Sequence, residues 1–193
     1  GMAHTAIIEK DIMLQLDSPF IIKLYQAFKD DQNLYFLLEA CLGGEVYKVL
    51  CSEDLHGVPL VVEYYSGVVV EAFVYLHEKR FAYRDLKPEN LLVTADGKAK
   101  LCDMGLAKFC VGKAYTLCGT PEYMAPEIVK QIGHGYAVDW WTLGIFIFEI
   151  LAGQPPFVDS DPMAIYELIL EGSVRYPRYF DRQSKNIVRK LLR

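Results

Sequence analysis

Three side chains with oxygen atoms that could bind a metal or accept a proton lie close together in the sequence. Asp85 and Asn90 belong to the segment Tyr83–Asn90, and Asp103 follows in Asp103-Met104-Gly105. A carboxylate and an amide carbonyl suit a hard cation such as Mg²⁺, which prefers oxygen ligands and keeps coordination positions for phosphate groups. We therefore predict that Asn90 and Asp103 hold magnesium, which leaves Asp85 free to accept a proton from a hydroxyl group.

Lys87 supplies a positive charge in the same segment. It follows Asp85 by two residues, so the two side chains lie on the same side of an extended chain. From there Lys87 can neutralise the charge of a phosphoryl group in transfer. Turns are rich in Asp and Asn for purely structural reasons, and a turn explains any one of these residues taken alone. The fixed offsets of the whole set favour a catalytic segment instead.

A tight reversal of the chain is needed to return Asp103 to Asn90. The apolar runs 91–93 and 99–101 flank the turn sequence Ala95-Asp96-Gly97-Lys98. Asp-Gly between two apolar runs is a strong hairpin signal. We expect this hairpin to bring Asp103 close to Asn90.

The other elements follow a simple order along the chain. Apolar residues at every fourth position predict a helix over residues 3–16. Two β-rich runs, 20–28 and 34–38, are separated by polar residues and predict a second hairpin. The expected later elements are a short helix from Glu45, a long one from Pro59, a loop at 105–123, an apolar helix at 137–152, and amphipathic helices at 163–170 and 183–192. Strands followed mainly by helices indicate an α+β fold.

The composition predicts a folded chain without a general basic surface. Of its 193 residues, 52% are hydrophobic, far more than in a disordered chain. The net charge of −5 and the pI near 5.4 disfavour a nucleic-acid binder or a protein of anionic membranes, since both need a basic face. No apolar run reaches the ~18 residues of a membrane span. Five cysteines without a Cys-x-x-Cys pair predict reduced thiols, and we expect a cytoplasmic protein.

Several motifs together resemble one known family. The segment Tyr83–Asn90, the triplet Asp103-Met104-Gly105 and the triplet Ala125-Pro126-Glu127 look like the catalytic loop, the magnesium motif and the end of the activation segment of eukaryotic protein kinases. Residues 116–123, Thr-Leu-Cys-Gly-Thr-Pro-Glu-Tyr, narrow the resemblance to the AGC group. The resemblance covers essentially the whole chain.

A subgroup is indicated by two further segments. Glu39-Ala40-Cys41-Leu42-Gly43-Gly44-Glu45 and Val69-Val70-Glu71-Ala72-Phe73 most resemble cGMP-dependent protein kinases, with cAMP-dependent kinases next. The resemblance implies ATP and Mg²⁺ as cofactors. It also implies a cyclic-nucleotide-binding regulatory region, which would lie outside this chain.

The resemblance also implies roles for the residues of the catalytic segment. Asp85 would be the catalytic base, Lys87 would contact the transferred phosphate, and Asn90 and Asp103 would hold the magnesium ions. Lys87 and Thr120 match the pattern of kinases that phosphorylate serine or threonine.

The nucleotide would be held by residues before and after this segment. Glu9 matches the glutamate of the αC helix that pairs with a lysine of the third strand. Backbone groups of Glu39 and Cys41 would bind adenine, with Leu92 as the apolar floor beneath it and Glu45 beside the nucleotide. A column of apolar side chains would link the two lobes, made of Met13, Leu24, Tyr83 and Met104.

Thr116 resembles the phosphorylated threonine of the activation loop. Arg84, Lys108 and His4 match positions that gather around this phosphate in the family. A phosphothreonine adds about −1.5 to −2 charge, so pairing with Arg84 would order the loop. Without the resemblance, Thr116 would be an ordinary surface residue of a loop.

The substrate is expected to be a protein with basic residues upstream of the phosphorylated site. Glu45, Glu89 and Glu167 match acidic positions that receive such residues, and Thr120 would lie beside the substrate. Three solvated glutamates are the alternative interpretation of these acids. We expect the remaining histidines to lie at the surface or at helix ends, namely His56, His77 and His134.

The resemblance divides the chain into an incomplete kinase domain. Residues 1–38 would be part of the N-terminal lobe (its αC helix and last two strands), 39–44 the hinge, and 45–193 a C-terminally incomplete C-terminal lobe. No Gly-x-Gly-x-x-Gly loop and no Val-Ala-Ile-Lys strand precede Glu9, and the family's arginine partner of Glu127 is also missing. We expect the chain to be a kinase fragment that is inactive or nearly so alone. The alternative is a pseudokinase that binds partners without catalysis.

Overall fold

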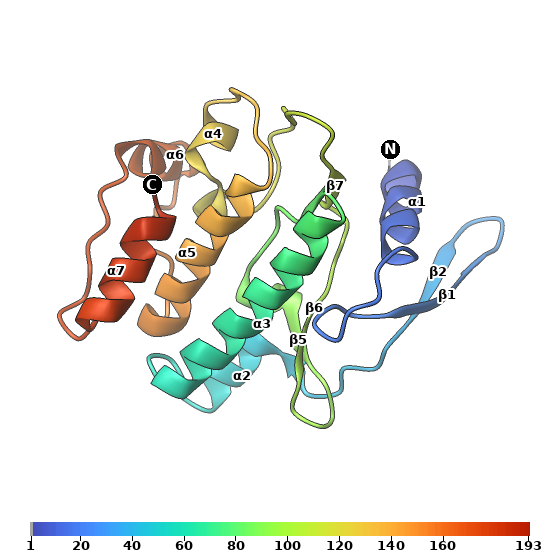
Figure 1. Cartoon of the computed structure of the whole chain (residues 1–193), viewed down its shortest axis with the longest axis horizontal. Coiled ribbons are helices and arrows are strands. Elements are labelled where there is room, and N and C mark those ends of the chain that lie inside the picture. Colours follow the sequence, from blue (N-terminus) through green and yellow to red (C-terminus); the bar gives the residue numbers. More distant parts are fainter. Residues whose placement is uncertain (1) are drawn as a thin grey trace.

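The computed structural model describes residues 2–193, with side chains described from residue 5 onward. Helix α1 (Met2–Met13) and the antiparallel strands β1 (Leu24–Lys29) and β2 (Leu34–Leu38) lie at one end of the long axis, and the larger helical part lies at the other (Figure 1). The content is mixed, as an α+β fold requires.

The β1–β2 hairpin confirms the first pair of predicted strands, although β1 begins at Leu24 rather than at residue 20. Asp30 fixes the turn, because its Oδ1 accepts hydrogen bonds from the backbone of Gln32 and Asn33. The residues before β1 pair elsewhere: Leu101 exchanges backbone hydrogen bonds with residues 20–22. This pairing connects the hairpin end of the molecule to the helical part.

The predicted Asp-Gly hairpin is also confirmed. Strands β5 (Leu91–Val93) and β6 (Ala99–Leu101) pair in antiparallel register, and β3 (Gly44–Glu45) adds to the other edge of β5. Gly43 lies so close to β5 that a Cβ there would come within 2.8 Å of the Val93 side chain. Only glycine fits this crossing.

The helical part is built around α5 (Ala137–Ala152), which is buried along most of its length, as predicted. Helices α3 (Pro59–Glu78) and α7 (Arg182–Leu191) pack beside it (Figure 1). Gly144 permits the close approach of α7, since a Cβ there would meet Leu191 and Leu192 below 3.0 Å. The remaining helices are α2 (Val46–Ser52), α4 (Pro126–Val129) and α6 (Pro162–Glu171).

Helix α3 is the one helix of the described residues that is long and apolar enough to cross a membrane. Its apolar stripe is buried inside the molecule instead, against α5, β6 and strand β4 (Phe81–Ala82). Phe73 lies at the centre of this stripe, fully buried, with its ring about 6 Å from those of Tyr83 and Trp140. The stripe therefore behaves as part of the core.

The predicted loop at 105–123 is mostly irregular but holds two short elements. Strand β7 (Lys108–Phe109) pairs with β4, and the 3₁₀ helix η2 (Pro121–Tyr123) follows near its end. A second 3₁₀ helix, η1 (Pro88–Asn90), lies directly before β5. These short elements flank the segments that carry the candidate site. Residues 83–87 lie between β4 and η1, and residues 110–120 lie between β7 and η2.

Candidate active site

Asp85 and Asn90 form the centre of a buried polar cluster. The Nδ2 atom of Asn90 donates to the carboxylate of Asp85 at 2.9 Å and to its backbone carbonyl at 2.8 Å. Both residues are less than a tenth exposed. Because Nδ2 is committed to Asp85, the Oδ1 atom of Asn90 is the end that can act as a ligand.

Lys87 and Thr120 complete this cluster. The Nζ atom of Lys87 lies 3.3 Å from the Asp85 carboxylate and donates to Thr120 Oγ1 at 3.3 Å. The Thr120 hydroxyl in turn lies 3.4 Å from Asp85 Oδ1. The structure thus brings together four of the predicted residues, from the catalytic segment and from the start of η2.

Asp103 is returned towards Asn90 by the β5–β6 hairpin. The backbone amide of Cys102 donates to the carbonyl of Asn90 at 2.9 Å, directly before Asp103. Asp103 has a φ of +57°, in the left-handed region that non-glycine residues rarely adopt. Its Oδ1 accepts a hydrogen bond from the amide of Gly105, which holds the carboxylate in place.

The donor chemistry of this pair fits magnesium. An amide oxygen and an exposed carboxylate are hard ligands, and Mg²⁺ is commonly held by one or two carboxylates together with waters and substrate phosphates. In the described part of the chain, no group of three or more His, Cys, Asp or Glu side chains is arranged to hold an ion. Asn90 and Asp103 could supply two oxygen ligands to such an ion.

The buried carboxylate of Asp139 holds the catalytic segment in position. This residue was not identified from the sequence. Its fully buried carboxylate accepts hydrogen bonds from the backbone amides of Tyr83 at 2.9 Å and Arg84 at 2.8 Å. The His77 ring lies 2.7 Å from the same carboxylate and packs between aromatic rings, among them that of Trp140. His77 lies in the last turn of α3, so the predicted position at a helix end is confirmed, and its ring also supplies a partner that the buried carboxylate needs.

Arg84 is held in a second left-handed conformation, with a φ of +70°. Its Nε donates to the carbonyl of Leu106, and its Nη1 lies 3.2 Å from His134 Nε2. His134 is 3% exposed, which contradicts the predicted surface position. Burial lowers the pKa of His134, and the Arg84 and Lys108 charges lower it further, so the ring is neutral at neutral pH and can accept from Arg84.

A cavity of about 750 Å³ lies between α1 and the segment after Asp103. Arg84, Lys108 and Thr116 all line it, so the structure brings the predicted phosphosite and two of its predicted partners to one place. Thr116 itself is exposed. The side chain of His4, the third predicted partner, lies outside the described residues.

The Glu9 carboxylate lies near that of Asp103, one of the two predicted magnesium ligands. Burial raises the pKa of Glu9, the Asp103 carboxylate raises it further, and a hydrogen bond with the backbone of Met104 lowers it. Among the described residues Glu9 has no ion-pair partner. The side chains predicted as a column between the lobes are all buried in the common core, namely Met13, Leu24, Tyr83 and Met104.

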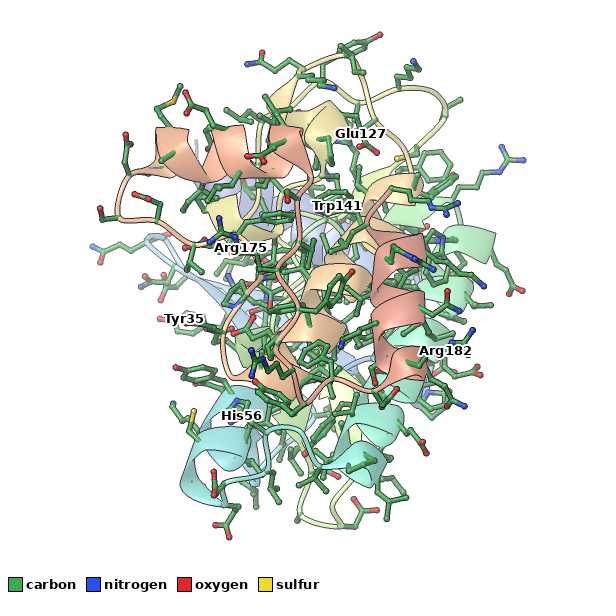
Figure 2. All side chains as sticks on the ribbon, turned by 90° about the vertical axis from the view of Figure 1, so that its left-hand side faces the viewer. Tyr35, His56, Glu127, Trp141, Arg175 and Arg182 are labelled. Atoms are coloured by element: carbon green, nitrogen blue, oxygen red, sulfur yellow. The ribbon has the colours of Figure 1, made fainter. Side chains whose placement is uncertain are left out.

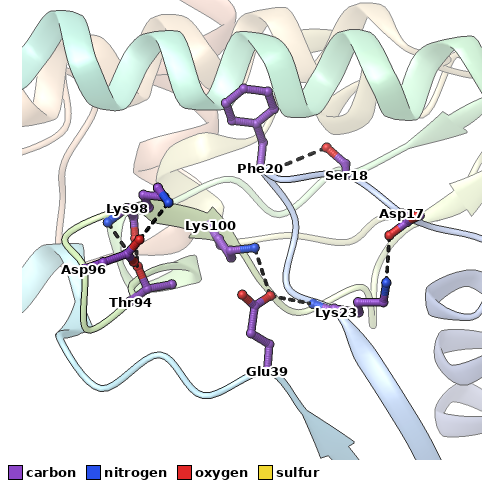
Figure 3. A network of polar contacts seen from close by, with 9 residues as sticks. All are labelled: Asp17, Ser18, Phe20, Lys23, Glu39, Thr94, Asp96, Lys98 and Lys100. Atoms are coloured by element: carbon purple, nitrogen blue, oxygen red, sulfur yellow. Dashed lines mark hydrogen bonds and ion pairs between the residues drawn. The ribbon is translucent and has the colours of Figure 1, made fainter.

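Glu39 connects three segments at the predicted hinge (Figure 3). Its Oε2 lies 2.9 Å from Lys100 Nζ on β6 and accepts from the backbone amide of Lys23. Its own amide donates to the carbonyl of Lys23, so the Glu39 carbonyl is the backbone group left for a ligand. Leu92 and Cys41 are half-buried nearby, and burial raises the pKa of the Cys41 thiol.

The predicted substrate acids lie on three elements, β3, η1 and α6, of which β3 contacts η1. Glu45 is paired with Lys48, at 2.7 Å on the first turn of α2. Glu89 is exposed on η1 and Glu167 is exposed on α6, and no hydrogen bond or ion pair in the described residues links either to Glu45. The carboxylate that lies near Glu89 is instead Glu149.

Glu149 is a buried acid on α5 that sequence reasoning did not single out. It accepts a hydrogen bond from the Tyr123 hydroxyl of η2. Burial raises the pKa of Glu149 to about 7, and the charges of Glu89 and Glu122 raise it, while the Tyr123 hydrogen bond lowers it. An acid inside an otherwise apolar helix is the signal that could have found it, because such a group must have a partner.

Glu127, the last residue of the triplet Ala125-Pro126-Glu127, is half-buried on α4 (Figure 2). It pairs with no cation in the described part of the chain. Trp141, on α5, keeps a buried indole N–H without a partner there. Its ring stacks on that of Phe157 at 6.1 Å.

Asp139→Asn tests whether the buried carboxylate holds the catalytic segment. An amide has one acceptor oxygen instead of two, so one of the amides of Tyr83 and Arg84 loses its partner, which costs about 1–3 kcal/mol of stability. We expect faster hydrogen exchange at these two amides and a lower unfolding midpoint. Asp31→Asn, in the exposed turn of the β1–β2 hairpin, is the control and should change neither. Unchanged exchange in Asp139→Asn would contradict the assignment.

Glu149→Gln tests the raised pKa. The folded protein binds a proton at Glu149 up to about pH 7, whereas the unfolded chain releases it near the ordinary glutamate pKa of 4.5. The stability from this group is therefore complete below pH 4.5 and is lost as the pH rises to about 7, by on the order of 3 kcal/mol. Urea unfolding at pH 5 and pH 7.5 should show this loss in the wild type and in Glu171→Gln, but not in Glu149→Gln. The same pH dependence in all three proteins would exclude Glu149 as the cause.

The sequence model of the protein kinase domain family matches residues 2–193 of this chain. The chain is 48% identical over 184 residues to the cAMP-dependent protein kinase catalytic subunit of Dictyostelium discoideum, covering 95% of this chain and 28% of that protein. It is 46% identical over 184 residues to the human cAMP-dependent protein kinase catalytic subunit PRKX, covering 95% of this chain and 51% of that protein. The rat cGMP-dependent protein kinase 2 is 47% identical over 189 residues, covering 96% of this chain and 25% of that protein.

Of eight similar relatives, four are cAMP-dependent and four are cGMP-dependent kinases, so the predicted preference for the cGMP-dependent group stays a prediction. The chain spans about half or less of the length of each of these relatives. The match to the family model nevertheless covers all residues after the first. The chain therefore belongs to the protein kinase family, within its AGC group.

Proposed function

We propose that this chain carries the catalytic segment of a serine/threonine protein kinase, which transfers the γ-phosphate of ATP to a protein hydroxyl. The observation that carries the proposal is the polar cluster of Asp85, Lys87, Asn90 and Thr120, together with the return of Asp103 to the backbone of Asn90. A purely structural turn would not need a buried carboxylate, an amide and a lysine in mutual contact.

The residues of the cluster have distinct tasks in this proposal. Asp85 orients the substrate hydroxyl and takes its proton, because Asn90 and Thr120 hold its carboxylate in one position. Lys87 places a positive charge beside the transferred phosphoryl group. Asn90 and Asp103 would hold magnesium by their oxygens. When bound, Mg²⁺-ATP supplies the phosphoryl group and partly neutralises its charge.

Other residues would contact the nucleotide and the substrate. The backbone at Glu39 and Cys41 would bind adenine above Leu92, with the hinge kept in place by the Glu39–Lys100 ion pair. Basic residues of a substrate would meet Glu89, with the buried Glu149 adding negative charge when it is ionised. Cyclic-nucleotide dependence, with cGMP as the ligand, is proposed from the sequence motifs and the names of the relatives.

Phosphorylation of Thr116 would act as a switch in this proposal. The phosphate would meet Arg84 and Lys108 across the shared cavity. Arg84 directly precedes Asp85, so pairing at this point would fix the position of the catalytic carboxylate.

The isolated chain is proposed to transfer little phosphate. The supporting observation is Glu9, which lies beside the like-charged Asp103 and has no cation partner among the described residues. A kinase needs a lysine between this glutamate and the nucleotide. A test of the catalytic residues should therefore not depend on the isolated chain.

The catalytic role of Asp85 is testable in a chimera, in which residues 2–193 replace the matching segment of the rat cGMP-dependent protein kinase 2. We expect Asp85→Asn to lower turnover of a basic peptide by ~10²–10⁴-fold, the range for a positioned base, because the amide cannot take the proton. Asp96→Asn, in the exposed β5–β6 turn, is the control and should leave turnover unchanged. An inactive parent chimera that still folds would favour the pseudokinase, and equal turnover of both variants would remove Asp85 from this role.

The switch at Thr116 is testable in the same chimera. We expect the phosphorylated form to exceed both the phosphatase-treated form and Thr116→Val by about tenfold, because a hydrogen bond to a charged group is worth about 1.5–3 kcal/mol. Intact mass measures phosphorylation and peptide turnover measures activity. Ser160→Ala, at an exposed loop serine, controls for the loss of a hydroxyl group. Equal turnover of the phosphorylated and dephosphorylated forms would rule out the switch.

A further inference from the structure

The last part of the chain has a charge opposite to that of the whole. Residues 173–193 hold seven of the 20 Lys and Arg residues but only one of the 25 Asp and Glu residues. Figure 2 shows Arg175 and Arg182 on the face of the molecule that α7 and the preceding segment form. Among the described residues, none of these seven cations is in an ion pair.

A groove of about 820 Å³ runs along α7 on this face. Its lining residues, which define the α7 groove, are all able to form hydrogen bonds: Tyr176, Arg182, Gln183, Lys185, Asn186 and Arg189. Arg182, Lys185 and Arg189 are spaced by three and four positions, so they share one side of the helix. They extend over about 10 Å along its axis.

The groove is held by rigid parts of the fold. Val188 of α7 is fully buried, and α7 packs on α5 where Gly144 leaves room. The Tyr176 ring forms part of the wall and packs against Phe148 and Phe180, at about 6 Å from each. The cations are therefore presented from a fixed surface.

The nearest acid does not neutralise these cations through ion pairs. Asp181 is the N-cap of α7, and its two carboxylate oxygens accept from the backbone amide and the hydroxyl of Ser184. Arg189 donates only to Asn186 Oδ1 among the described residues, which is a neutral partner. The groove thus carries three cations against one nearby acid, and none of the three is in an ion pair among the described residues.

We infer that the α7 groove docks an acidic segment of a partner polypeptide. Acidic side chains on one side of an extended segment recur about every 7 Å, so a few residues match the ~10 Å span of the three cations. One phosphate group is too small to contact all three. Tyr176 is the one aromatic side chain of the lining, and its ring packs against Phe148 and Phe180, so it does not extend outward as an anchor in a lipid layer.

The matched pair Arg189→Gln and Lys190→Gln tests this inference. The two residues are neighbours on α7, both exposed, but only Arg189 lines the groove. The probe is a fluorescein-labelled octaglutamate peptide, whose binding to the 193-residue chain is followed by anisotropy at low salt. We expect Arg189→Gln to weaken binding about two- to fivefold, as for an exposed charge pair, and Lys190→Gln to leave it unchanged. The triple variant Arg182→Gln, Lys185→Gln, Arg189→Gln should abolish it.

Three outcomes would overturn the inference. These are no binding of octaglutamate by the wild type, equal weakening by Arg189→Gln and Lys190→Gln, and tighter binding of phosphatidylserine-containing vesicles than of the peptide. The last outcome would assign the groove to a membrane surface. Thermal unfolding checks that each variant is folded, and the result does not depend on catalytic activity.

Discussion

A fully buried carboxylate, that of Asp139, supports the rest of the site. It accepts from two consecutive backbone amides and also contacts His77, so its charge is distributed over three partners. Burying a charge is costly unless such partners are supplied, and removing one of them leaves the cost in place. The aromatic rings around His77 exclude water from the arrangement. The catalytic segment is therefore attached to the most buried helix of the molecule, α5.

This attachment explains how two strained residues persist on either side of the hairpin. Arg84 and Asp103 both have positive φ values, which cost on the order of 1–3 kcal/mol each for non-glycine residues. Arg84 is held by Asp139 through its amide, and Asp103 by its own hydrogen bond to Gly105 and by the pairing of Cys102 with Asn90. Strain of this kind fixes side chains in directions that relaxed turns would not give. Asp103 is itself one of the two strained residues, and Asp85 directly follows the other, Arg84.

Local signals predicted the elements well, while contacts between distant segments escaped them. The turn at Asp96-Gly97 and the apolar pattern of α5 are short-range features, and both hairpins and the buried helix formed as expected. Asp139 was missed because an acid in the first turn of a helix has an ordinary explanation, stabilisation by the helix dipole. His134 was misplaced because its burial depends on a partner fifty residues away in the sequence, Arg84. The ion pair between Glu45 and Lys48, by contrast, joins residues only three positions apart, which is a spacing that can be recognised in the sequence.

The tight crossing at Gly43 sets where the molecule can bend. Its amide donates to the Val93 carbonyl at 2.8 Å, and there is no space for a side chain between the two strands. Any movement of the β1–β2 hairpin against the helical part must then bend the chain before Gly43 and also on the other side of the hairpin, after residues 20–22, which pair with Leu101. Gly43 is thus a fixed point of the chain, and the fold uses its lack of a side chain rather than its flexibility.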